Sequence, residues 1–360
     1  MPDCEITFSR PKKVSNAQHG NDRGCKHAPT KHLVGSKILF WGCLIAFIAS
    51  PLRDTTDSFL TLHTAVSLAR GLWGDIAPIA PNVVLHPTVV SLADGRILSN
   101  YPIGPAFLLT PIAWIADRLF PESVEWFLRN NSYFTHKVFA STIGALTIVI
   151  FYKAMLRRFD HSTAITLALI LAFATSIWST TTRGLWTHGP LVMWVCVAFY
   201  FTLGPHSTKA AALAGAASAA AFAMRPTGVI AILAIGNVFA WRGPRALGWY
   251  ALGCGIGLSL WAALQIATYG QLIPAYYNPK IMLSVSAALT EAMVGNLASP
   301  SRGLFVFSLC CCSQCSEFSG RFTRAPIDRW ESQLCSRWWL NGSLSRSIRV
   351  GRAATHLGHA

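Results

Sequence analysis

The sequence predicts an all-α polytopic membrane protein, a bundle of about seven or eight transmembrane helices with a structured first external loop. Hydrophobic residues make up 52% of the chain and charged residues only 12%, whereas soluble proteins carry about 25% charged residues. The net charge is +15, from 30 basic and 15 acidic residues. This charge gathers in the two ends and in the predicted inner loops, so it indicates membrane orientation rather than a nucleic-acid-binding stripe.

The predicted spans are apolar runs that recur along the chain between polar turns. They are Leu33–Leu52, Tyr133–Leu156, Ala164–Trp178, Leu191–Leu203, Ala210–Met224, Val229–Trp241 and Leu247–Ala267, and an eighth begins near Gly303. Several are shorter than the roughly 20 residues that cross a bilayer, so we expect their flanking residues to extend them. The run Ala210–Met224 is rich in Ala and Gly, which favours close packing between helices in lipid.

The basic residues predict which segments lie on each side of the membrane. The arm of residues 1–32 is rich in Lys and Arg and is therefore expected to be cytoplasmic. If the run Ile103–Phe120 crossed the membrane, the pair Arg157-Arg158 would lie outside, against the positive-inside rule. We therefore predict that this run is re-entrant or interfacial, and that residues 53–132 form one external region. A spanning Ile103–Phe120, with one short downstream segment that does not span, stays an open alternative.

Two elements are expected within the external region. The first is a helix along the membrane surface, predicted by an apolar face that consists of Phe59, Leu62, Val66 and Ala69. Asp57 is able to cap the start of this helix, and Gly71 is able to end it. Farther on, Asp94-Gly95 separates two short β-prone runs, Val89–Ala93 and Arg96–Tyr101. An Asp-Gly pair in this position is a strong β-hairpin signal.

Candidate catalytic groups are the two carboxylates that follow the first span. Asp54 and Asp57 lie where the chain is expected to leave the membrane, and a carboxylate there is suited to act as a general base or to bind a metal. Capping of the surface helix is the alternative role for Asp57. We predict no cofactor, because the sequence has no nucleotide-binding loop or dinucleotide fingerprint; a divalent metal stays an open alternative.

Candidate substrate-binding groups lie at the predicted outer ends of later spans. Arg183 and His188, on either side of Trp186, are suited to meet an anionic phosphate and a sugar face. The alternative is an ordinary interfacial belt, where Trp and Arg are common. Arg225 stands where an Ala-rich helix breaks at Pro226, so it is either a phosphate ligand or the partner of Asp54 or Asp57.

The last part of the chain, residues 309–360, differs in character from the rest. Its polar, Arg- and Ser-rich stretch has no apolar periodicity and predicts a disordered or aberrant tail, such as a frame change would produce. Four cysteines in six residues, Cys310, Cys311, Cys312 and Cys315, leave a metal site as the alternative. Adjacent cysteines converge poorly on one tetrahedral centre, which favours the first interpretation.

The order of these motifs resembles the type C glycosyltransferase superfamily, in particular bacterial relatives of protein mannosyltransferases and aminoarabinose transferases. The resemblance covers roughly residues 33–308, the expected glycosyltransferase-like domain. It rests on Asp54 after the first span, Leu68-Ala69-Arg70-Gly71, the string from Asp94-Gly95-Arg96 to Tyr101-Pro102-Ile103-Gly104-Pro105, and Leu185-Trp186-Thr187-His188-Gly189-Pro190.

The resemblance implies transfer of a sugar from a polyprenyl-phosphate donor to an acceptor hydroxyl on the outer face of a bacterial plasma membrane. It does not identify the acceptor. It implies that Asp54 is the base, with Asp57 as second choice. It also places the segment around Tyr101 near the lipid phosphate, where relatives carry a charged residue that this chain lacks. Relatives continue for several more spans, so a truncated, inactive form is one alternative; a transporter or flippase-like carrier of lipid-linked sugars is another.

Overall fold

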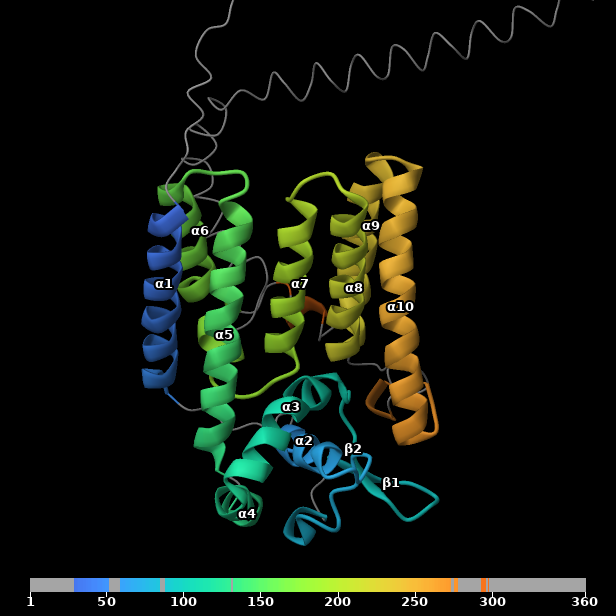
Figure 1. Ribbon diagram of the computed structural model, residues 1–360. Coiled ribbons are helices and arrows are strands. Elements are labelled where there is room, and N and C mark those ends of the chain that lie inside the picture. The colour runs from blue at the N-terminus through green and yellow to red at the C-terminus, as the bar shows by residue number, and fades with distance from the viewer. Residues whose placement is uncertain are drawn as a thin grey trace, which may run out of the picture. The chain divides into compact units, whose positions relative to one another are not determined.

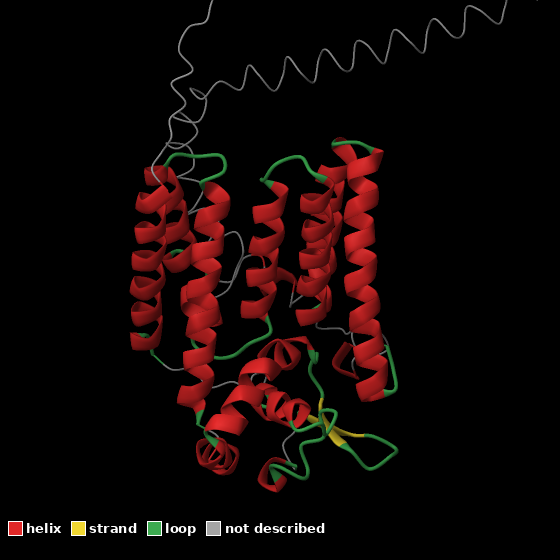
Figure 2. Cartoon of the chain, viewed as in Figure 1, coloured by secondary structure: helices red, strands yellow, loops and turns green. Residues whose placement is uncertain are grey.

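The computed structural model describes residues 29–51, 59–84, 88–130, 132–272, 275–277, 293–295 and 297. The chain divides into one unit of residues 1–278 and another of residues 279–360, and nearly all the described residues belong to the first. The first unit is mainly helical, with one small sheet of two strands among its described residues (Figures 1 and 2). The predicted span near Gly303 and the tail lie outside the described residues.

The long helices of this unit lie side by side as a bundle (Figure 1). They are α1 (Pro29–Ala49), α5 (Tyr133–Met155), α6 (His161–Phe173), α7 (His188–Thr202), α8 (Thr208–Met224), α9 (Val229–Trp241) and α10 (Pro244–Tyr269). Helix α5 packs on α1, α6 and α7, and α8 packs on α7, α9 and α10. Each of the seven predicted apolar runs between Leu33 and Ala267 overlaps one of these helices, and several helices begin earlier than predicted because polar residues supply their first turn.

The extension of α6 shows how this happens. The helix begins at His161 instead of Ala164, because the Asp160 carboxylate accepts hydrogen bonds from the backbone N–H groups of Ser162 and Thr163 at 3.0 and 3.2 Å. These bonds satisfy donors that have no partner within the helix. At its other end α6 stops at Phe173 and a π-helical turn, η2 (Ile177–Thr181), follows.

Two helices are long and apolar enough to cross a membrane, namely α5 and α10. The shorter helices are apolar as well, and their outward surfaces expose large hydrophobic side chains. Examples are Trp41 and Ile45 on α1, Ile230 and Leu233 on α9, and Ile256 and Leu260 on α10, each more than half exposed. An apolar outer surface of this extent is typical of a surface covered by lipid or by another protein.

The remaining described elements form a small subdomain, residues 59–84 and 88–130, at one end of the bundle (Figure 1). It contains α2 (Thr61–Ala69), the 3₁₀ turn η1 (Pro81–Val83), β1 (Val89–Ser91), β2 (Ile97–Ser99), α3 (Gly104–Leu119) and α4 (Pro121–Asn130). Helix α3 packs against α2 and α4 and does not join the parallel helices of the bundle. The side of a membrane on which this subdomain lies stays a prediction.

The hairpin prediction is confirmed. Strands β1 and β2 pair antiparallel with Val90 opposite Leu98, and the backbone N–H of Leu92 donates to the Arg96 carbonyl at 2.9 Å. Gly95 has a φ of 85°, which glycine adopts without the steric cost that a side chain would bring.

That α2 lies along a membrane surface stays a prediction, but the predicted start of the helix is wrong. Helix α2 ends as expected, with Gly71 at a φ of 76°, but its residues 62–67 are all buried. Polar side chains of α2 bond within the subdomain; Ser67 Oγ, for example, donates to the Asp75 carbonyl at 2.6 Å. The helix begins at Thr61 with Leu60 at the N-cap position, so Asp57 is not its N-cap residue.

Candidate functional site

The subdomain and the bundle approach each other closely at Gly104, the first residue of α3. A Cβ atom added there would overlap the carbonyl oxygen of Ala223 on α8 and lie 2.6 Å from its carbonyl carbon. Only glycine permits this approach. It places the start of α3 beside the end of α8, one residue before Arg225.

Arg225 and His188, both predicted as binding residues, contact each other here. Arg225 follows α8 in an extended conformation, with φ −159° and ψ 131°, and its carbonyl accepts from Gly228 N at 2.8 Å in the tight turn that leads into α9. Its Nη1 lies 2.9 Å from Nδ1 of His188 at the start of α7. The indole ring of Trp186 packs beside the His188 ring, with centroids 5.9 Å apart.

Arg183 lies in the same connection between α6 and α7, and the cation nearby is Lys137. Its charge acts on the ammonium of Lys137, in the second turn of α5. The connection is held to α5 by a hydrogen bond from Ser141 Oγ to the Thr182 carbonyl at 3.3 Å. One loop therefore carries the predicted cation Arg183 toward α5 and the predicted His188 toward Arg225.

Lys137 is the most deeply buried cation in the described part of the chain, with 2% of its surface exposed. Its ammonium donates to the carbonyl oxygen of Ser50, just past the C-terminal end of α1, and lies 3.2 Å from Ser50 Oγ. The C-terminal end of a helix carries partial negative charge on its free carbonyl groups. Lys137 therefore satisfies the end of α1 and fixes the point from which the chain continues toward Asp54.

Three N–H donors at this boundary are buried without a hydrogen-bond partner among the described residues. They are Nε of Arg183, Nε of Arg225 and Nε1 of Trp186. Within the described ranges, carboxylates form ion pairs with Arg70 and Arg96 but with none of Lys137, Arg183 and Arg225. Buried donors and cations of this kind are costly unless an anion or another acceptor satisfies them. We call Lys137, Arg183 and Arg225, together with the His188 ring that accepts from Arg225, the cation row.

Tyr101 is fixed mainly through its backbone. The Tyr269 hydroxyl, at the end of α10, donates to the carbonyl oxygens of Ser99 and Tyr101 at 2.9 and 3.3 Å. The Tyr101 ring is half-buried and packs against the Tyr276 ring, with centroids 4.9 Å apart. Tyr101 thus stands three residues before the Gly104 contact, and α10 holds it in place.

The predicted carboxylates Asp54 and Asp57 lie outside the described residues. In the parts that are described, no group of three His, Cys, Asp or Glu side chains converges as a metal site would require.

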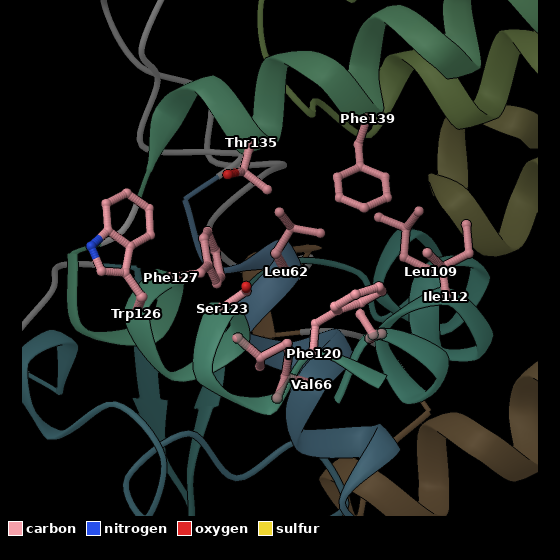
Figure 3. Close-up of a pocket in the computed structure, with 13 residues that line it drawn as sticks. Leu62, Val66, Leu109, Ile112, Phe120, Ser123, Trp126, Phe127, Thr135 and Phe139 are labelled. Atoms are coloured by element: carbon pink, nitrogen blue, oxygen red, sulfur yellow. The ribbon is translucent and has the colours of Figure 1, made fainter. Parts of the chain in front are cut away.

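An apolar groove of about 410 Å³ lies between α2, α3, α4 and the start of α5 (Figure 3). Leu62, Leu109 and Phe127 line it together with Thr135 and Phe139 of α5. Thr135 and Phe139 are four residues apart and share one face of the helix, whereas Lys137 projects from the opposite face. The groove and the Lys137 side chain therefore lie on opposite faces of α5.

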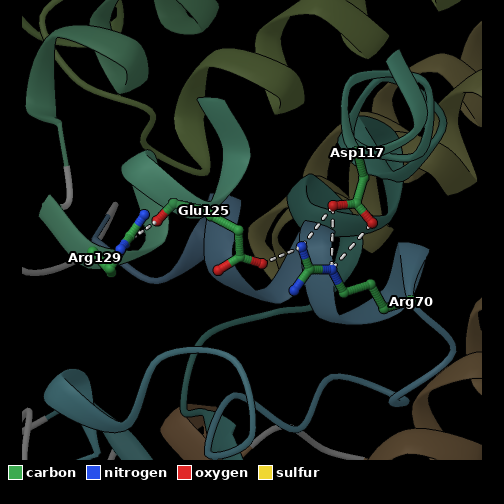
Figure 4. Close-up of polar contacts among 4 residues, drawn as sticks. All are labelled: Arg70, Asp117, Glu125 and Arg129. Atoms are coloured by element: carbon green, nitrogen blue, oxygen red, sulfur yellow. Dashed lines mark hydrogen bonds and ion pairs between the residues drawn. The ribbon is translucent and has the colours of Figure 1, made fainter. Parts of the chain in front are cut away.

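Arg70 joins the three helices of the subdomain. Its guanidinium lies between Asp117 of α3 and Glu125 of α4 (Figure 4), with Nη2 at 2.6 Å from Asp117 Oδ1 and 2.8 Å from Glu125 Oε1. The hydrogen bonds from Arg70 hold the pKa of Asp117 below its usual value. This contact supports the position of α3, and through Gly104 the position of α3 relative to Arg225.

Neither the known protein families, nor the curated proteins, nor the solved structures contain a match to this chain.

Lys137 was not among the residues predicted from the sequence. It stands five residues into an otherwise apolar span, and an ionisable residue inside a predicted span is a signal of a functional or structural role. Its partner, the Ser50 carbonyl, is 87 residues away in the chain, so sequence spacing gave no indication of the contact.

Proposed function

We propose that this chain is an integral membrane protein whose whole bundle crosses the bilayer, with the N-terminus in the cytoplasm of a bacterial cell. Two observations support this beyond the two long helices. The exposed outer surfaces of α1, α9 and α10 are apolar, and the subdomain also exposes Trp114, Ile115 and Phe120 next to the bundle. Aromatic side chains at the end of a bundle suit the interface between lipid and water.

The proposed activity is that of a glycosyltransferase, which moves a sugar from a polyprenyl-phosphate donor to an acceptor hydroxyl on the outer face. The observation that carries it is the cation row with its unpartnered N–H donors. Phosphate oxygens are strong acceptors that suit buried guanidinium groups. The apolar helices beside the row would keep the isoprenoid part of the donor in lipid.

The proposed reaction needs one base and several cations. The acceptor hydroxyl loses its proton to the carboxylate of Asp54, and its oxygen bonds to the anomeric carbon of the sugar. The bond from that carbon to the phosphate oxygen breaks, and its electron pair leaves with the lipid phosphate. Arg183 and Arg225 stabilise the charge that grows on the phosphate, and attack from the opposite face inverts the anomeric carbon.

Lys137 has a positioning role in this proposal. It fixes the end of α1, four residues before Asp54 in the sequence, and so restricts where the base is able to lie. The groove of Figure 3 is not assigned to the phosphate of the donor, because no cation among the described residues lines it.

The test is a transfer assay on membranes that contain the full chain, with a panel of radiolabelled polyprenyl-phosphate hexoses and pentoses. Transfer should occur from one donor class and fall at least about a hundredfold in Asp54→Asn, the size usual for a lost general base. Arg225→Gln should also lose transfer, by at least about tenfold. Arg96→Gln is the matched control, since Arg96 pairs with Asp94 in the exposed hairpin and should leave transfer unchanged.

Two outcomes would contradict the proposal. If no donor in the panel supports transfer but labelled lipid crosses the membrane in a manner that depends on Arg225, the chain is a carrier. If neither transfer nor movement depends on Asp54 or Arg225, the cation row has no role in handling lipid-linked sugars.

A further inference from the structure

A second group of cations lies at the end of the bundle opposite the subdomain. The connections α5–α6, α7–α8 and α9–α10 are all at that end (Figure 1). Each carries basic residues: Arg157 and Arg158 in the first, His206 and Lys209 in or just after the second, and Arg242 and Arg245 in the third. Orientation in the membrane accounts for the sign of these charges, but it does not account for a cavity lined by three of the residues, His206, Arg242 and Arg245.

That cavity has a volume of about 270 Å³ and lies between the α7–α8 and α9–α10 connections. Its polar lining consists of His206, Ser207, Thr208, Arg242 and Arg245. Ser207 also caps α8, since its Oγ accepts from the backbone N–H of Ala210 at 3.1 Å. The positive end of the 17-residue helix α8 thus adds to the charge of the side chains.

Arg242 is held in place at this cavity. Its Nη2 donates to the Thr202 carbonyl at 2.6 Å, and its guanidinium lies 4.9 Å from the centre of the Phe239 ring. Burial and the neighbouring charge of Arg158 lower the pKa of Arg242. Burial, followed by the charges of Arg242 and Arg158, lowers the pKa of His206. Cations are therefore grouped closely enough to repel one another.

Within the described residues, no carboxylate forms an ion pair with any of these cations. The acid nearest in sequence is Asp160, and its carboxylate is engaged at the start of α6, where it accepts from two backbone N–H groups and from Thr163 Oγ1 at 2.7 Å. Grouped cations without a carboxylate are stabilised by an anion from outside the chain.

We propose that this cavity binds a phosphate group, on the side of the membrane opposite the subdomain. The site is separate from the proposed glycosyltransferase site and does not depend on it. Two sources have the required chemistry, namely the headgroup of an anionic phospholipid and a free phosphate. A phosphate oxygen accepts charge-assisted hydrogen bonds from Arg242 and Arg245, and the Ser207 and Thr208 side chains supply neutral donors.

The experiment measures the thermal unfolding midpoint of the full chain in a zwitterionic detergent. One arm titrates inorganic phosphate against chloride at matched ionic strength; the other titrates dihexanoyl phosphatidylglycerol against dihexanoyl phosphatidylcholine. We expect phosphate or phosphatidylglycerol to raise the midpoint. Arg242→Gln should weaken the apparent affinity at least about tenfold, and Arg245→Gln at least about threefold. Arg96→Gln, on the subdomain, should bind as the parent does.

The two titrations distinguish a lipid headgroup from free phosphate, and their results are able to refute the proposal. A rise with phosphatidylglycerol alone identifies a lipid headgroup, and a rise with inorganic phosphate as well identifies a site open to soluble phosphate. Arg245 is exposed and forms no ion pair among the described residues, so its variant should fold even if Arg242→Gln does not. The proposal is overturned if neither probe exceeds its control, or if Arg245→Gln keeps the whole shift.

Discussion

Replacing Gly104 with alanine should loosen the junction between the subdomain and the bundle. The new Cβ would lie 2.6 Å from the carbonyl carbon of Ala223 and 3.0 Å from the backbone nitrogen of Met224. Carbon atoms in contact are ordinarily about 3.5–4.0 Å apart, so the start of α3 must move away from α8 by roughly 1 Å. The obstacle is helix backbone, which cannot rotate away as a side chain can. Overpacking of this kind costs about 1–3 kcal/mol, against a gain of about 0.5–1 kcal/mol from replacing glycine in a helix.

The matched control is Gly248→Ala in α10, where an added Cβ meets no atom within 4 Å. That variant should be as stable as the parent or slightly more stable. Chemical or thermal unfolding of the purified full chain measures both. Gly104→Ala should also reduce sugar transfer, because Arg225 follows the displaced contact by one residue. If Gly104→Ala is as stable as Gly248→Ala, then α3 does not pack against α8 as described, and the geometry inferred for the cation row fails with it.

Three further predictions concern the subdomain and its surroundings. Arg70→Gln should destabilise the fold by about 1–2 kcal/mol. Because Arg70 lowers the pKa of Asp117, the parent keeps this contribution above the ordinary Asp pKa of about 4. The two chains should therefore converge in unfolding midpoint as the pH falls from about 4 through the lowered pKa of Asp117. Asp57→Asn should retain most transfer activity while Asp54→Asn loses it, and equal mild effects would indicate a structural loop. In intact cells, an impermeant thiol reagent should label Glu122→Cys, whereas Ser162→Cys should react only after permeabilisation; the reverse result would exclude the predicted orientation.

The helices of the bundle were predictable because each contains a long, mainly apolar run between turn residues, and hydrophobicity and length suffice to find such runs. The hairpin was predictable for a different reason, since Asp94-Gly95 is a local signal that needs no distant partner. The burial of α2 was not predictable. His63 and Ser67 are buried because α3, α4 and β2 pack against the helix, and periodicity in one segment carries no information about the segments that cover it.

The candidate site was predictable as a set of residue types but not as a geometry. Arg183, His188 and Arg225 were identified individually from their positions at the ends of spans, whereas the contact between His188 and Arg225 joins residues 37 apart. A second contact at the site is the packing of α3 against the end of α8, which Gly104 permits. The sequence alone does not distinguish a glycine that permits a close approach between helices from a glycine in a turn.

The cations at the two ends of the bundle have different causes. The cations of the α5–α6, α7–α8 and α9–α10 connections lie together at one end, as the positive-inside rule requires if that end is cytoplasmic. Lys137, Arg183 and Arg225 lie at the other end, where the same rule gives no reason to place them. If this end is the outer one, a cation there needs a local cause. For Lys137 that cause is the carbonyl end of α1; for Arg183 and Arg225, whose Nε atoms have no partner among the described residues, an anionic ligand would supply it. Removal of either arginine should consequently affect ligand handling more than stability.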